Sequence, residues 1–206
     1  MKVLHKLPRS ALYLLLGISF SPVLMAADCS INYDQDTTIS ADCDGFSLDR
    51  NQDFDISIIT GVSVRSPGGE DDDNVIKLHS DVGGVLTNNG TIETTYGNRA
   101  IDISYTPATV NAIINTGNIT ANRDTITIGP GSTLNLLSNA GTIYSYDSKS
   151  IYNQGSINSI NNSGQIQSNS GAIYNIDTLS SLTNTNLITA STNAIDNGGT
   201  LGTITN

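Results

Sequence analysis

The sequence predicts an all-β protein: a parallel β-helix, or β-solenoid, built from coils of 22–25 residues. Two repeating columns carry this prediction. The motif Asn-x-Gly-x-Ile recurs at 88–92, 115–119, 139–143 and 162–166, and at 184–188 with Asn186 in place of glycine. Isoleucine recurs at 76, 101, 126, 151, 173 and 195, in steps of 25, 25, 25, 22 and 22 residues. A period of this length indicates a solenoid of stacked coils.

The composition of the repeats favours strands over helices. The units are rich in Asn, Ser, Thr, Gly and Ile. Asn and Gly are poor helix formers, whereas Ile and Thr suit a pleated surface. Helix-pair repeats are longer than these units, and the leucine pattern of leucine-rich repeats is absent. Three short strands and three turns fit the period, and equivalent strands of stacked coils would lie about 4.7–4.9 Å apart.

Each position of the motif has its own expected role. Glycine adopts positive φ freely and Asn tolerates it, so the glycine column predicts a left-handed turn in every coil (Gly90, Gly117, Gly141, Gly164 and Asn186). The asparagine column predicts an amide ladder between coils (Asn88, Asn115, Asn139, Asn162, Asn184 and Asn206). The isoleucine that ends each motif is expected to face a dry interior.

A second apolar pair, such as Leu179 and Leu182, follows in each coil. Its three-residue spacing breaks strand alternation, which predicts a bend or bulge between the two residues.

Residues 1–27 read as a secretory signal peptide. Lys2, Lys6 and Arg9 precede the apolar stretch 11–20, and small residues at 25–27 offer a cleavage site. The alternative is an uncleaved anchor, although the apolar run is short for a spanning helix. No other segment is apolar enough to span a membrane, so we expect an exported mature chain that does not cross one.

Charge limits the possible partners. The chain has 19 acidic and 9 basic residues, and three of the basic ones lie within residues 1–27. All of the acidic residues follow, so residues 28–206 carry a net charge of −13. Such a chain is a poor match for nucleic acid or an anionic membrane surface.

Residues 28–60 are predicted to form an N-terminal cap that covers the open end of the repeats at 61–206. Cys29 and Cys43 would form a disulfide in an oxidising compartment and close a short loop, a constraint worth about 3 kcal/mol. With His79 as the only histidine after residue 27, zinc has little support.

Calcium is the one cofactor that the sequence raises. Asp49, Asn51, Asp53 and Asp55 resemble the start of an EF-hand loop, but Phe54 replaces its glycine. A second stretch, with Asp71 and Asp73, resembles one calcium-binding nonapeptide without a second copy. Solvated acidic loops explain both stretches more simply, so the expectation is no cofactor.

The coils carry few charges. Arg99, Arg123 and Lys149 are expected to line one edge of the solenoid. Tyr152 and Tyr174 hold equivalent positions, which predicts a stacked pair or, alternatively, a stacking face for sugars.

Several phrases resemble the passenger repeats of bacterial autotransporters. These are Asn-Ser-Gly-Gln-Ile at 162–166, Gly-Ala-Ile-Tyr-Asn at 171–175 and Gly-Thr-Leu-Gly-Thr-Ile-Thr-Asn at 199–206, within a region of resemblance covering roughly 74–206. The resemblance implies a right-handed parallel β-helix, exported to the periplasm and then displayed on, or secreted from, a Gram-negative cell. Passengers of this family are commonly adhesins or stalks, so host surface or matrix molecules, or further copies of the chain, become expected partners.

Two departures from the family pattern stand out. No segment shows the repeated alternation of an outer-membrane barrel, and the chain ends at Asn206, in the middle of a repeat. We therefore expect a fragment or a truncated product of a longer reading frame.

The functional expectation is a non-enzymatic surface passenger. A polysaccharide lyase or hydrolase on the same fold is the enzymatic alternative, and it would need clustered carboxylates with a basic residue on one face. The coils instead offer acids that are scattered in the sequence. A self-associating solenoid is the third possibility. Serine-protease chemistry lacks its Gly-x-Ser-x-Gly elbow.

Overall fold

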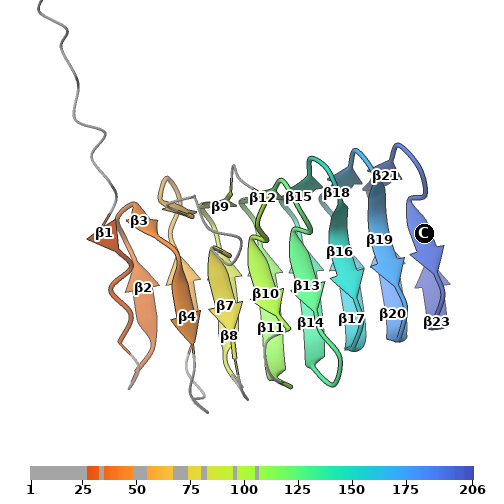
Figure 1. Cartoon of the computed structure of the whole chain (residues 1–206), viewed down its shortest axis with the longest axis horizontal. Helices are drawn as coiled ribbons and strands as arrows, with labels where there is room; N and C mark the ends of the chain where they lie inside the picture. Colours follow the sequence, from red (N-terminus) through yellow and green to blue (C-terminus); the bar gives the residue numbers. More distant parts are fainter. Residues whose placement is uncertain are drawn as a thin grey trace, which may run out of the picture.

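The computed structural model describes residues 27–32, 35–48, 55–66, 74–79, 83–94, 97–104 and 107–206. Within these ranges the chain is all-β and contains no helix. Its strands form three sheets, and every strand pairing is parallel. Figure 1 shows the strands stacked side by side along the long axis, from β1 at one end to β23 at the other. The predicted parallel β-solenoid is confirmed.

Three sheets share the strands. Sheet A contains β1 (Ala27–Asp28), β3 (Cys43–Asp44), β6 (Ser63–Arg65), β9 (Thr91–Glu93), β12 (Asn118–Ala121), β15 (Thr142–Ser145), β18 (Gln165–Ser168) and β21 (Leu187–Ala190). Sheet B contains β2 (Thr37–Ile39), β5 (Ile56–Ile58), β8 (Val85–Asn88), β11 (Thr109–Asn115), β14 (Thr133–Asn139), β17 (Ser156–Asn162), β20 (Thr178–Asn184) and β23 (Thr200–Thr205). Sheet C contains β4 (Phe46–Leu48), β7 (Ile76–Leu78), β10 (Ile101–Ile103), β13 (Ile126–Ile128), β16 (Lys149–Asn153), β19 (Gly171–Asn175) and β22 (Ile195–Asn197).

Each coil passes through sheet B, then sheet A, then sheet C. The isoleucine column of the sequence lies in sheet C, where each member pairs with the next: Ile76, Ile101, Ile126, Ile151, Ile173 and Ile195. A step of one sequence repeat is therefore a step of one coil along the solenoid axis.

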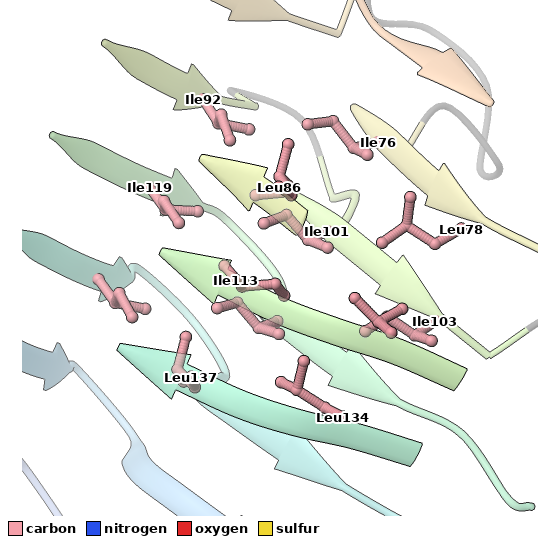
Figure 2. Close-up of a cluster of buried hydrophobic side chains, with 14 of the residues drawn as sticks. Ile76, Leu78, Leu86, Ile92, Ile101, Ile103, Ile113, Ile119, Leu134 and Leu137 are labelled. Atoms are coloured by element: carbon pink, nitrogen blue, oxygen red, sulfur yellow. The ribbon is translucent and has the colours of Figure 1, made fainter. Parts of the chain in front are cut away.

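The core is a continuous column of aliphatic side chains. Figure 2 shows Ile76 and Ile101 from sheet C, Leu86 and Ile113 from sheet B, and Ile92 from sheet A pointing toward one another. The last isoleucine of the motif is fully buried in four successive coils: Ile92, Ile119, Ile143 and Ile166. Burying one such side chain contributes about 1.5–3 kcal/mol, so the repeated isoleucines are the main source of stability.

Sheet B contains the predicted break in alternation. Leu179 and Leu182 are both fully buried, and the two residues between them face outward. The same pattern holds for Ile157 and Ile160 in the preceding coil, which pair with those leucines in register. Because β11, β14, β17 and β20 carry the irregularity at the same place, these strands still stack in register.

The glycine column is aligned between coils, but the left-handed turn expected there is wrong. Of the glycines in the described ranges, Gly61 and Gly131 have positive φ, 83° and 76°, and neither belongs to the column. The physical requirement is close approach. A Cβ at Gly117 would lie 2.0 Å from the carbonyl oxygen of Gly90, and one at Gly141 would lie 2.0 Å from that of Gly117. Glycine is needed at 117, 141 and 164 because these successive corners almost touch.

The N-terminal segment is part of the same stack. Cys29 and Cys43 form the predicted disulfide, which joins the chain next to the paired strands β1 and β3. Strands β2, β3 and β4 pair directly with β5, β6 and β7, so residues of the expected cap already contribute to all three sheets. Residues 1–26 of the predicted signal peptide lie outside the described ranges. The described residues contain no helix long and apolar enough to cross a membrane.

The glycine column yields a test of the close-approach explanation. Gly141→Ala should lower the free energy of unfolding by about 3 kcal/mol, because the new methyl group overlaps a main-chain oxygen that cannot move aside. Gly171→Ala is the matched control, since its Cβ would meet nothing closer than 3.7 Å. Urea unfolding monitored by circular dichroism measures both. Equal effects of the two substitutions would contradict the explanation.

Candidate functional site

A ladder of buried asparagines runs through the coils at the corner between sheets B and A. Each amide nitrogen donates to the amide oxygen of the next coil, in the order Asn88, Asn115, Asn139, Asn162, Asn184, Asn206, at 2.6–2.8 Å. The same nitrogens also donate to main-chain carbonyls, as Asn139 does to Gln165 at 3.1 Å. The ladder thus satisfies polar groups that the corner takes out of water.

A second ladder was not foreseen from the sequence. In the corner that follows sheet C, Asn153 donates to Asn175 and Asn175 donates to Asn197, both at 2.6 Å. Ile128 occupies the equivalent position in the preceding coil and pairs with Asn153. The feature of the sequence that could have predicted this second ladder is the repeated Tyr-Asn dipeptide at 152–153 and 174–175.

The first ladder gives a second test. Asn139→Ala should lower the free energy of unfolding by about 2–4 kcal/mol, because the buried Asn115 loses one acceptor and the buried Asn162 loses the amide donor to its side-chain oxygen. Asn111→Ala removes an exposed amide of the same type and should cost about 0.5 kcal/mol or less. Denaturant midpoints of the two variants decide the matter, and a small effect at residue 139 would show that the ladder is not a stabilising element.

Most of the calcium candidates cannot be placed. Asp49, Asn51 and Asp53 lie outside the described ranges, as do Asp71 and Asp73. Asp55 is described, and its carboxylate accepts a hydrogen bond from the main-chain nitrogen of Val85 at 2.9 Å. This bond links adjacent coils. The described residues contain no group of three or more His, Cys, Asp or Glu side chains that could hold a metal ion.

The structure brings charged residues from two adjacent coils, and an asparagine from a third, together next to sheet C. Asp102 accepts from Arg99 at 2.7 Å and from Asn74 at 2.6 Å, through the same carboxylate oxygen. Asp124 of the next coil accepts from the hydroxyl of Ser148 at 2.6 Å. The Nε atom of Arg99 lies 3.9 Å from Asp124, so one guanidinium faces two carboxylates. Acids that are scattered in the sequence are therefore clustered in space, contrary to expectation.

The charged cluster, defined here as Asn74, Arg99, Asp102 and Asp124, buries both of its carboxylates, whereas the Arg99 side chain is 21% exposed. Asp102 is fully buried and Asp124 is 4% exposed. Within the described residues, Nε of Arg99 and Oδ1 of Asp102 have no hydrogen-bond partner, and neither does the buried hydroxyl of neighbouring Thr127. A network that is buried and incompletely paired depends strongly on its single cation.

A tyrosine pair lies two coils further along sheet C. Tyr152 and Tyr174 pair in register, and their rings stack at 5.5 Å with 24° between their planes. The ammonium group of Lys149 lies 5.7 Å from the ring centre of Tyr174. Burial, and then the negative charge of Asp124, raise the pKa of Tyr152 above its usual value of 10.0. The neutral phenol is therefore favoured, and its contribution to stability is present below pH 10 and lost as the pH rises through the higher pKa.

The charged cluster provides a third test. Arg99→Met should lower the free energy of unfolding by about 3–5 kcal/mol, because it leaves the buried carboxylate of Asp102 without its cation. Arg65 pairs with Glu93 at the surface, so Arg65→Ala should cost about 1 kcal/mol or less. Thermal and urea unfolding of the two variants give the comparison. A loss at Arg99 no larger than that at Arg65 would show that the cluster does not stabilise the fold.

A third, exposed ladder lies on the outer face of sheet B. Asn158 donates to Asn135 at 2.8 Å, and Asn135 donates to Asn111 at 3.3 Å. This ladder runs along three consecutive strands, β17, β14 and β11, in the direction opposite to the buried ladders. Its amides meet solvent, so they are available to a partner.

Comparisons with protein-family models, with curated protein sequences and with solved structures found no significant match.

Proposed function

We propose that this chain is a non-enzymatic, exported surface passenger of the autotransporter kind, acting as a structural stalk or as an adhesin. The sequence supports this proposal through its signal-peptide pattern and its passenger-like repeats. The Cys29–Cys43 disulfide is consistent with an oxidising compartment outside the cytoplasm. The proposal places the protein in the periplasm first and then at the surface of a Gram-negative cell or in its surroundings.

The observation that carries the proposal is the uninterrupted parallel stack from β1 to β23. Each coil is held to the next by main-chain hydrogen bonds, by the buried amide ladders and by the aliphatic core. An architecture of this kind is extended, and it presents equivalent outer positions at regular steps along its length. Those properties suit a spacer that holds a binding surface away from a cell.

The enzymatic alternative now has one observation in its favour. Arg99, Asp102 and Asp124 lie together on adjacent coils, and a lyase or hydrolase on this fold would require such a grouping. Both carboxylates are buried, however, and each already accepts hydrogen bonds from neighbouring side chains. A general acid or base must reach its substrate, so this geometry favours a stabilising role.

Export and activity can be tested on the same material. The full chain with a C-terminal tag, expressed in a Gram-negative host, should lose its N-terminal segment and appear outside the cytoplasm. Alkylating reagents should then leave Cys29 and Cys43 unmodified unless a reductant is added first.

Particles coated with the purified product should bind to host cells or matrix, and the product should release no unsaturated or reducing ends from acidic polysaccharides. Retention in the cytoplasm with reactive thiols would refute export, and steady release of cleavage products would favour the enzyme.

A further inference from the structure

The outer face of sheet B has an unusual composition for so acidic a protein. Its last five strands read TVNAIIN, TLNLLSN, SINSINN, TLSSLTN and TLGTIT, without one charged residue. Residues 28–206 nevertheless carry a net charge of −13. From residue 107 onward the charges lie in sheet C and in the turns: Arg123, Asp124, Asp147, Lys149, Asp177 and Asp196. These strands thus contain no charged residue, although at their edge the Asp177 carboxylate accepts a hydrogen bond from the Thr178 hydroxyl at 3.1 Å.

Two outward rows of this face repeat polar groups from β11 to β20, whereas other outward positions hold the half-buried Ile114 and Leu136. Thr133, Ser156 and Thr178 form one outward row, and each pairs in register with the next. Asn111, Asn135 and Asn158 form the row beside it, which continues to the exposed Ser180. The hydrogen bonds of the exposed ladder hold the amides of this second row in one orientation. A partner would therefore meet groups that are already ordered, which lowers the entropic cost of binding.

The repetition restricts what the partner can be. Equivalent groups recur along the solenoid axis at about the spacing of neighbouring strands, 4.7–4.9 Å. A ligand that satisfies each row must also repeat along its length, so it must be a linear polymer. Amides and hydroxyls each offer both donors and acceptors, and sugar hydroxyls complement them. An anionic polymer would be repelled by the acidic protein, and a cationic one would find no carboxylate in these strands.

We propose that the outer face of sheet B, from β11 to β23, binds a neutral polysaccharide chain that lies along the solenoid axis. The proposal rests on the proposed function as an adhesin and names the class of its partner. The exposed asparagine ladder and the threonine and serine row beside it form hydrogen bonds to the sugar units. Each sugar unit spans one or two coils of the solenoid.

A second copy of the chain fits this face less well. Sheets that pack face to face form a dry layer of interdigitated apolar side chains. Here such packing would bury rows of Thr, Ser and Asn whose hydrogen-bonding groups would lose water.

Sheet A is also uncharged from β12 to β21, but its outward row changes from Asn118 to Thr142, Gln165 and Leu187. Because that row does not repeat, it lacks the property that selects a regular polymer.

The test measures binding of the purified full chain to cellulose, with soluble hydroxyethylcellulose as competitor and alginate as an anionic comparison. The wild-type chain should bind cellulose, be displaced by hydroxyethylcellulose and ignore alginate. The double variant Asn135→Asp and Asn158→Asp places two negative charges in the ladder and should weaken binding about tenfold or more, the equivalent of one or two lost hydrogen bonds. The matched control, Asn169→Asp with Asn193→Asp, adds the same charge at exposed residues outside sheet B and should bind like wild type.

A second variant protects the test against misfolding. Ser180→Lys projects a long side chain over the same face without changing the ladder, and it should also weaken binding of cellulose severalfold while the thermal midpoint remains that of wild type. Three results would overturn the proposal: no binding of either neutral polymer by the folded chain, equal binding by the ladder variant and its control, or concentration-dependent oligomers that the ladder variant abolishes. The last result would place a second copy on the face. A failure of export would count against the proposed function alone, because the polysaccharide-binding measurements use purified protein.

Discussion

The stacking of parallel strands at a single spacing is the constraint on which the rest of this molecule depends. Once one coil lies directly on another, the corners must be narrow enough to nest, and the polar side chains buried at those corners must find their partners one coil away. The glycines of the column meet the first condition, because even a methyl group would collide with a neighbouring carbonyl. The buried asparagines meet the second condition, because an amide can donate to one coil and accept from the other.

The same constraint explains how closely sequence period and geometry agree. A column of isoleucines read at steps of 25 and 22 residues becomes a row of paired residues in sheet C, although the steps differ. The additional residues of the longer coils are accommodated in turns, so the strands keep their register. Fold class, period, core positions and disulfide could therefore be predicted from local composition and spacing alone.

Three features could not be predicted, for different physical reasons. The glycine column suggested positive φ. A sequence shows only that the side chain is absent, and it does not show whether a left-handed backbone conformation or a close neighbouring atom requires that absence. The charged cluster assembles Asn74, Arg99 and Asp124 from separate coils, and their burial depends on how the turns fold over the outside of sheet C. A repeat pattern gives positions on strands, whereas turns of unequal length carry no such register. The second asparagine ladder begins only where Asn153 follows Ile128, so its three members, Asn153, Asn175 and Asn197, were too few to suggest it.

The direction of the ladders has an electrical consequence. In both buried ladders the amide nitrogens point toward the C-terminal coil and the oxygens toward the N-terminal coil. Their dipoles therefore add along the axis, with the positive end at the last coil, whereas the exposed ladder opposes them. No single amide within a buried ladder can rotate alone, because its reversal would set two donors or two oxygens face to face. Each ladder is thus polarised in one direction along its length, and the main-chain carbonyls that also accept from its nitrogens keep that direction fixed.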